Sequence, residues 1–270
     1  MNVFEVIKGD GPIVLAQPHG GTFLPSNVLT GLNARGQALA DTDWHIARLY
    51  DGLLEGATIV RSNIHRYVID ANRDPMGTSL YPGQNTTSLC PLTDFDGQDI
   101  WLPGRAPSAD EVEARRLTYH APYHAALAEE LDRVQATHGV AVLYDCHSIR
   151  SKIPFLFEGA LPTFSIGTNG GTSCAPAIQD AVSARCEGAS DFRTVVNGRF
   201  KGGWTTRHYG QPGMNVHAIQ MELAQMAYME EFPPWEYLPN RAARLQPILS
   251  DVLKSLDTLA RSGALTTKGS

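Results

Sequence analysis

The chain has 270 residues, 43% of them apolar, so it is long enough and apolar enough to bury a substantial core. Its 22 basic and 28 acidic residues give a formal net charge of −6 without any run of lysine or arginine, which argues against a nucleic-acid partner or an anionic membrane surface and favours a small-molecule ligand. No apolar stretch approaches the roughly 18 residues that span a bilayer, and the N-terminus lacks a secretory pattern, so a cytoplasmic protein is expected.

The predicted elements are short apolar strands separated by helices and loops. Aliphatic and β-branched runs predict five strands: Ile13–Ala16, Ala57–Ser62, Val140–Asp145, Phe164–Ile166 and Val216–Leu223. A capping box at Ser108 predicts the start of a long helix, which Pro122 is expected to kink. Apolar residues at three- and four-residue spacing predict a second helix from Leu245 to Leu259. This order predicts an α/β fold with a largely buried sheet.

Residues 74–107 form a long segment without helical or strand periodicity. The segment is rich in Gly, Pro, Thr and Asp. Such loops are uncommon inside compact domains and often act as lids over a functional site. The alternative is a surface excursion without a function. Because no repeat or linker divides the chain, we expect one domain over residues 1–270 with this segment as an insertion.

Two histidines follow predicted strands. His19 stands in PHGG directly after Ile13–Ala16, and His147 stands in DCHS after Val140–Asp145. Open α/β sheets bind ligands at the carboxyl ends of parallel strands, so both histidines are expected at one edge of the sheet. Two histidines and a carboxylate form a zinc site with one position open for water. Taken alone, His19 could instead cap a turn.

The carboxylate of such a site has one source in the motif DTDWH, which contains Asp41, Asp43 and His45. The motif precedes a predicted amphipathic helix, where an aspartate usually serves as an N-cap. Spacing alone does not select Asp43 over His45 as a ligand.

The cysteines are predicted to be reduced and to pack in the interior. They lie far apart without any C-x-x-C pair: Cys90, Cys146, Cys174 and Cys186. Cys146 adjoins His147, but side chains alternate along a strand, so the two point to opposite faces. A cysteine–histidine dyad is therefore disfavoured.

One glutamate and several arginines complete the set of candidates. Glu222 lies among Ile, Met and Leu in a predicted strand, where burial is costly unless the carboxylate acts on a ligand or is paired. In RYVIDANR, the side chains of Arg66, Asn72 and Arg73 suit the recognition of a carboxylate, because a guanidinium donates two parallel hydrogen bonds. The alternative is a structural pair of an arginine with the aspartate of this motif. Arg207, in GGWTTRHYG, is a further candidate.

Five motifs occur in order across most of the chain: PHGG, TDWH, RYVIDANR, DCHS and QMEL. Together they resemble the N-formylglutamate amidohydrolases, also called N-formylglutamate deformylases, which are related to zinc carboxypeptidases and aspartoacylase-like metallohydrolases. The resemblance implies a mixed, mostly parallel sheet flanked by helices in a zinc-carboxypeptidase-like (phosphorylase/hydrolase-like) architecture. It also implies one divalent metal ion, zinc, at the strand ends.

The activity that the resemblance implies is hydrolysis of N-formyl-L-glutamate to L-glutamate and formate, a step in histidine degradation. The alternatives are a deacylase of another N-acyl amino acid, such as an N-acetyl or N-succinyl substrate, and a non-catalytic protein that binds a metal or a carboxylate. Glu222 would accept a proton from water and pass it to the departing amine. Its presence favours an enzyme.

The resemblance also implies roles for the other candidates. His19 and His147 would be metal ligands. The broader zinc-carboxypeptidase pattern has a glutamate three residues after the first histidine, where this chain has Thr22. The carboxylate ligand must then come from elsewhere, and the resemblance implies Asp43, because the aspartate of the DW pair looks like the fixed member of the family's second motif; Asp41, His45 and Asp145 are the alternatives.

The substrate implied by the resemblance carries two carboxylates, so cationic side chains are expected to hold it. Asn72 and Arg73 are assigned to the α-carboxylate. Arg66 and Arg207 are the other cationic residues expected to bind substrate.

Overall fold

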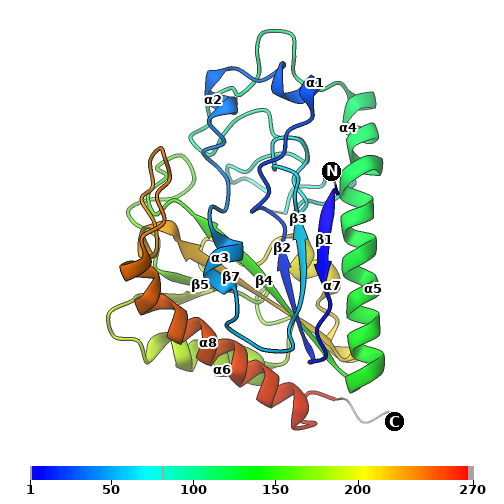
Figure 1. Cartoon of the computed structure of the whole chain (residues 1–270), viewed down its shortest axis with the longest axis vertical. Helices are drawn as coiled ribbons and strands as arrows, with labels where there is room; N and C mark the ends of the chain where they lie inside the picture. Colours follow the sequence, from blue (N-terminus) through cyan, green and yellow to red (C-terminus); the bar gives the residue numbers. More distant parts are fainter. Residues whose placement is uncertain (1, 81, 267–270) are drawn as a thin grey trace.

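A central sheet organises the computed structural model, which describes residues 2–80 and 82–266 (Figure 1). Within these ranges its strands are β1 (Phe4–Ile7), β2 (Ile13–Gln17), β3 (Thr58–Ser62), β4 (Ala141–Ile149), β5 (Phe164–Gly167), β6 (Thr194–Val196) and β7 (Val216–Ala224). Their order across the sheet is β1-β3-β2-β4-β7-β5-β6. Strands β3, β2, β4 and β7 are parallel, whereas β1 and β5 run antiparallel to β3 and β7. The predicted α/β fold with a mixed, mostly parallel sheet is confirmed.

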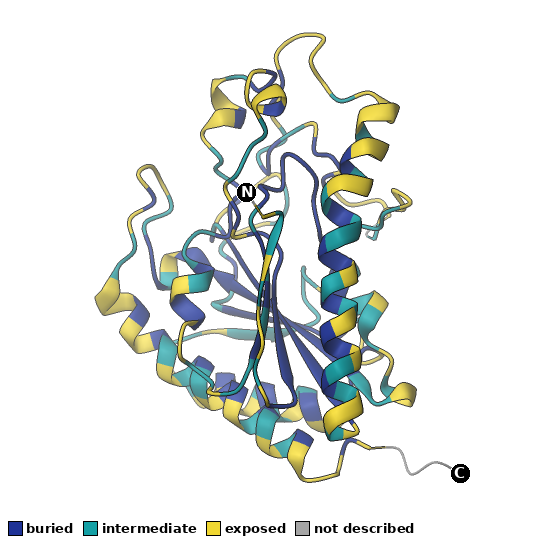
Figure 2. Cartoon of the chain, turned by 45° about the vertical axis from the view of Figure 1, so that its right-hand side comes forward, coloured by how far each residue is buried: buried dark blue, intermediate teal, exposed yellow. Residues whose placement is uncertain are grey.

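Helices cover both faces of the sheet. Along one face, α4 (Ala109–Arg115), a π-helical turn η1 (Arg116–His120) and α5 (Ala121–His138) form one long rod, whereas α6 (Pro176–Glu187) and α8 (Pro239–Arg261) lie on the other face (Figure 1). Strands β2, β4, β5 and β7 are buried between these layers, and α5 and α8 expose only their outer sides (Figure 2). No helix in the described part of the chain is long and apolar enough to cross a membrane.

The side chains of β4 alternate between the two helical layers. Leu143 packs in the cluster that contains Leu127 of α5, and Cys146 packs in the cluster that contains Leu249 of α8. All four cysteines are free and buried. The predicted packing role of Cys146, on the face opposite His147, is confirmed.

The segment 74–107 folds over the carboxyl ends of β2 and β3, together with the short helices α1 (Ser26–Leu29) and α2 (Ala34–Gln37) (Figure 1). The remaining short elements are α3 (Ile46–Tyr50), α7 (Trp204–Tyr209), η2 (Pro212–Met214) and η3 (Gln225–Ala227). Ile100 and Trp101 of the segment are buried against Val28 of α1. Its inner part is therefore packed against the domain.

The observed elements differ from the predicted ones mainly at their limits. The capping box at Ser108 is present, and its hydroxyl accepts a hydrogen bond from the main-chain nitrogen of Glu111. The departure from α-helical geometry near Pro122 is the π turn just before it. Strand β4 continues past Asp145 to Ile149, so His147 lies within the strand. The short edge strands β1 and β6, which are only partly buried, were not predicted.

Candidate metal centre and active site

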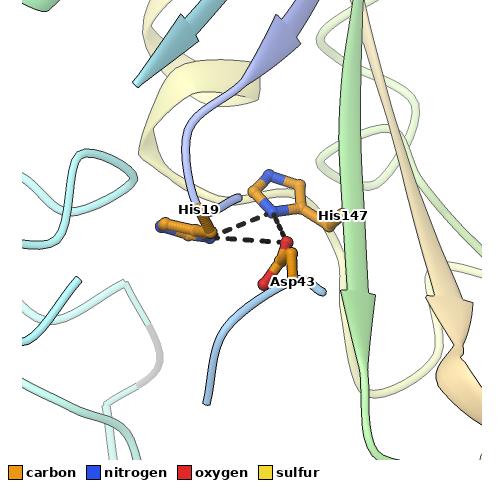
Figure 3. A group of neighbouring side chains, drawn as sticks. All are labelled: His19, Asp43 and His147. Atoms are coloured by element: carbon orange, nitrogen blue, oxygen red, sulfur yellow. Dashed lines mark hydrogen bonds and ion pairs between the residues drawn. The ribbon is translucent and has the colours of Figure 1, made fainter. Parts of the chain in front are cut away.

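Three buried side chains converge at the edge of the sheet: His19 follows β2, Asp43 precedes α3, and His147 lies in β4 (Figure 3). The Nδ1 atoms of the two histidines lie 3.2 Å apart. Oδ2 of Asp43 lies 3.2 Å from Nδ1 of His147 and 3.8 Å from Nδ1 of His19. The structure therefore brings together the three residues predicted as metal ligands.

The local sequence explains this convergence. Parallel pairing of β2 with β4 brings the ends of these strands, and so His19 and His147, to the same edge. A Cβ atom at Gly21 would lie 2.3 Å from the main chain of Asn63, so only glycine permits the close approach that turns the chain after His19. The main-chain nitrogen of Asp43 donates to the carbonyl oxygen of His19, 3.1 Å away. This bond fixes Asp43 beside the histidine.

The converging atoms of His19, Asp43 and His147 suit the coordination of a divalent cation. Nε2 of His19 lies 2.7 Å from Oδ1 of Asp70, and Nε2 of His147 lies 3.0 Å from Oδ1 of Asp145. With a cation bound, carboxylates at these positions favour protons on both Nε2 atoms, so that both Nδ1 lone pairs then face the cation. Three acceptors then point at one place, an arrangement that a cation stabilises. Two histidines and one carboxylate are a ligand set that zinc commonly takes.

The charges around His19, Asp43 and His147 also favour binding of a cation. Burial lowers the pKa of His147, but Asp145 and Asp43 outweigh it and raise this pKa well above its usual range. Burial, followed by Arg66, lowers the pKa of His19 to about 4. Burial raises the pKa of Asp43, yet Arg66 and the histidines together bring it below its ordinary value. The centre therefore combines an ionised carboxylate with a neutral His19.

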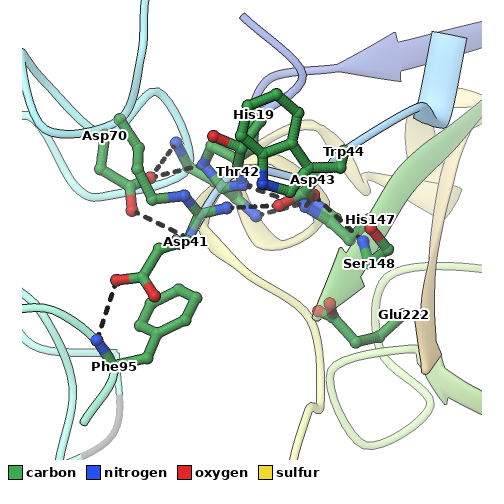
Figure 4. Close-up of polar contacts among 12 residues, drawn as sticks. His19, Asp41, Thr42, Asp43, Trp44, Asp70, Phe95, His147, Ser148 and Glu222 are labelled. Carbon is green, nitrogen blue, oxygen red and sulfur yellow. Dashed lines mark hydrogen bonds and ion pairs between the residues drawn. The ribbon is translucent and has the colours of Figure 1, made fainter. Parts of the chain in front are cut away.

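The alternative ligands in the motif DTDWH face other partners. Asp41 accepts a hydrogen bond from the main-chain nitrogen of Phe95, 2.8 Å away, and points away from the centre (Figure 4). His45 places Nε2 2.7 Å from the carbonyl oxygen of Trp235. The geometry therefore favours Asp43 as the carboxylate ligand.

Glu222 lies beside His19, Asp43 and His147, which we call the metal-centre group (Figure 4). It stands opposite His147 in the parallel pairing of β4 with β7, so both side chains emerge on the same face of the sheet. Gln220 donates to Oε2 of Glu222 over 3.2 Å and accepts a hydrogen bond from the main-chain nitrogen of Gly203 over 2.7 Å. Burial raises the pKa of Glu222 to about 8. A buried carboxyl with a raised pKa beside a candidate metal centre suits proton transfer.

The centre opens into a cavity of about 580 Å³, part of it open to solvent. Its walls include the two histidines, Glu222, three arginines and a group of apolar side chains. The residues with charged or apolar side chains, besides Glu222, are Arg66, Arg73, Arg199, Phe95, Ile149, Leu156 and Phe200. The cavity therefore suits a small anionic ligand.

Comparison with known proteins places the chain in a family. A sequence profile of the N-formylglutamate amidohydrolases matches residues 11–229. The chain belongs to this family. It is 46% identical over 255 residues to the N-formylglutamate deformylase of Pseudomonas aeruginosa, covering 94% of this chain and 96% of that protein. It is 43% identical to the N-formylglutamate deformylase of Pseudomonas putida, covering 94% and 95%.

A solved structure agrees with this placement. The N-formylglutamate amidohydrolase from Ralstonia eutropha JMP134 matches with a TM-score of 0.79 and 25% identity, over 96% of this chain and 98% of that one. The family resemblance of the five sequence motifs is confirmed. This chain is thus an amidohydrolase by family.

In this member of the N-formylglutamate amidohydrolase family, two of the predicted arginines pair with carboxylates of the centre. Nη2 of Arg66 lies 2.7 Å from Oδ1 of Asp43, and its Nη1 lies 3.8 Å from Oδ2 of Asp70. Nη1 of Arg73 lies 3.6 Å from Oδ2 of Asp70, and its Nη2 donates to the hydroxyl of Thr87. Both arginines line the cavity. The alternative role, a structural pair of an arginine with Asp70, is therefore present, and both arginines also line the cavity.

Asn72 and Arg207 lie in different surroundings. Asn72 lines the cavity, with Nδ2 3.0 Å from Nε2 of His147, and its Oδ1 accepts a hydrogen bond from the main-chain nitrogen of Thr205. Arg207 donates to the carbonyl oxygens of Gly202 and Leu80 and is not one of the described residues that line the cavity.

Two histidines that the sequence interpretation did not include support the main chain around Asn72. His120, in the π turn, places Nε2 3.1 Å from the carbonyl oxygen of Arg73. His124, one turn further along α5, places Nε2 2.7 Å from the carbonyl oxygen of Ala71. Their i, i+4 spacing is the one available signal that they share a helix face.

Proposed function

We propose that this chain hydrolyses N-formyl-L-glutamate to L-glutamate and formate with one divalent metal ion, zinc, held by His19, Asp43 and His147. The observation that carries the proposal is the convergence of these three ligand atoms beside Glu222 in a cavity lined by arginines. The names of the two Pseudomonas relatives support the choice of substrate.

His19, Asp43 and His147 would hold the ion, which would polarise the formyl carbonyl and make a nearby water molecule easier to deprotonate. Glu222 accepts the proton of that water and delivers it to the departing amine nitrogen, so the carboxylate returns to its starting state. Asp70 and Asp145 orient the two histidines from their far nitrogens.

Substrate binding is assigned to the polar side chains of the cavity wall. Arg73 and Asn72 are proposed to bind the α-carboxylate. Arg66 extends the positive charge beside the centre, while it also holds Asp43 in place. Arg207 remains a predicted substrate-binding residue. Its guanidinium donates to the carbonyl oxygen of Leu80 and would have to release that hydrogen bond to reach the substrate.

Formate release is the direct test of this function. The purified protein is expected to release one formate per N-formyl-L-glutamate, to lose this activity after treatment with a chelator, and to regain it when zinc is added back. N-acetyl- and N-succinyl-L-glutamate serve as competing substrates. Faster release of acetate or succinate would assign another N-acyl substrate, and full activity after demonstrated metal removal would refute the metal-dependent mechanism.

Arg73→Ala is expected to lower kcat/KM for N-formyl-L-glutamate by roughly 10- to 100-fold, the cost of one charge-assisted hydrogen-bond partner. Because the α-carboxylate is bound in both ground state and transition state, most of the loss should appear in KM. Steady-state kinetics measures the split. An unchanged KM and kcat/KM would show that Arg73 does not bind substrate.

A further inference from the structure

Arg199 is a third arginine of the cavity wall, and it belongs to none of the five sequence motifs. It follows β6 in the chain. Its Nε donates to the carbonyl oxygen of Leu156 over 2.9 Å, and its Nη2 donates to the carbonyl oxygen of Asn85 over 2.7 Å. Its guanidinium carbon also lies 5.4 Å from the ring centroid of Phe200. These contacts give the guanidinium a defined direction at the cavity wall.

The wall that carries Arg199 is anchored on both sides. Phe200 packs with Leu156 on an apolar cluster that includes Ile149, at the end of β4. Four residues after Arg199, the main-chain nitrogen of Gly203 donates to Gln220 on β7, the residue that also contacts Glu222. The position of Arg199 is thus tied to the strands that carry the proposed catalytic groups.

The three arginines of the cavity differ in their surroundings. Arg66 and Arg73 lie near the carboxylates of Asp43 and Asp70, so part of their charge is balanced by the metal centre. Arg199 donates to two carbonyl oxygens, which orient its guanidinium on the part of the cavity wall that also carries Leu156 and Phe200. A ligand whose first carboxylate binds Arg73 can therefore direct a second carboxylate toward Arg199.

The other groups beside Arg199 suit the rest of such a ligand. Leu156 and Phe200 present apolar surface that can contact methylene groups, and Asn85 and Thr86 also line the same cavity. This combination of aliphatic surface and a cation matches an acidic side chain with a short aliphatic stem.

We propose that Arg199 binds the side-chain carboxylate of the substrate and so selects acidic N-acyl amino acids over neutral ones. The assignment rests on the proposed function and adds to it the residue that reads the substrate side chain. Arg73 and Asn72 then hold the α-carboxylate, and the two carboxylates are read by different parts of the wall.

The test compares N-formyl-L-glutamate with N-formyl-L-glutamine, which has the same shape without the side-chain charge. The ratio of the two kcat/KM values, measured on one preparation, does not depend on the fraction of protein that is folded. Arg199→Gln is expected to lower this ratio by roughly 10- to 100-fold, through loss of activity on the glutamate substrate. Arg199→Lys, which keeps the charge but not the planar fork, is expected to restore part of the ratio.

Arg193→Gln is the matched control. Arg193 also donates to a backbone carbonyl, that of Ala160, but lies exposed and outside the described cavity lining, so its variant should keep the wild-type ratio. A wild-type ratio in Arg199→Gln, or an equal loss on both substrates, would overturn the assignment. The same holds if Arg207→Gln lowers the ratio and Arg199→Gln does not. Failure of the zinc-loaded wild-type protein to release formate from N-formyl-L-glutamate would instead refute the proposed function, and the assignment with it.

Discussion

Replacing Glu222 by glutamine is expected to lower kcat for formate release by roughly 10²- to 10⁴-fold while the divalent ion remains bound. Glutamine keeps the shape of the side chain but can neither take a proton from water nor deliver one to the amine. The three converging ligand atoms belong to other residues, so metal content should stay at the wild-type level. Burial raises the pKa of Glu222 to about 8 in the metal-free site, so a neutral amide is also tolerated near pH 7.

Two measurements on the same samples check this prediction: turnover of N-formyl-L-glutamate and metal per chain by elemental analysis. Glu187→Gln makes the same substitution at the exposed end of α6 and should change neither value. Wild-type turnover in Glu222→Gln would remove Glu222 from proton transfer. Loss of the ion would mean that Glu222 is a ligand.

Asp43→Asn is expected to abolish stoichiometric metal binding and, with it, formate release. The substitution removes the only formal negative charge among the three ligand atoms, so the loss in metal affinity should exceed the roughly 10- to 100-fold typical of changes to residues behind the ligands. It also removes the closest carboxylate from buried Arg66, at 2.7 Å. Breaking such a buried pair should lower the free energy of unfolding of the metal-free protein by about 3 kcal/mol.

Asp41→Asn provides the comparison, because Asp41 lies two residues earlier and is equally buried. Its carboxylate contacts Tyr67 and the main chain of Phe95, so this variant should keep its metal. Elemental analysis measures the metal content of both variants, and thermal denaturation measures their stability without metal. The reverse pattern, with metal lost only in Asp41→Asn, would move the third ligand to Asp41.

Much of the fold and of the metal-centre group could be predicted because it depends on strand geometry. Apolar runs marked the central strands, and the common edge of parallel strands placed His19 and His147 together. Alternation along β4 separated Cys146 from His147 correctly. Predictions of this kind need only the periodicity of a strand and the direction of its neighbours.

The remaining features depend on the paths of loops. Asp70 was considered only as a partner for an arginine, yet it also holds the far nitrogen of His19. Arg199 reaches the cavity through the irregular chain between β6 and α7, where no periodicity relates sequence to position. The edge strands β1 and β6 are short and partly exposed, so their apolar signal is weak.

The three converging residues, as the proposed metal ligands, would also link assembly of the centre to folding of the whole sheet. His19 and His147 are separated by 128 residues in the chain and meet only where β2 and β4 pair. An unfolded chain would pay the entropy of closing that long loop before it could offer both nitrogens to one ion. The ion should therefore bind the native state far more tightly than the unfolded one, so each tenfold rise in free ion concentration above Kd adds about 1.4 kcal/mol to the free energy of unfolding. The concentration of free metal ion would thus determine the stability of the fold as well as the rate of catalysis.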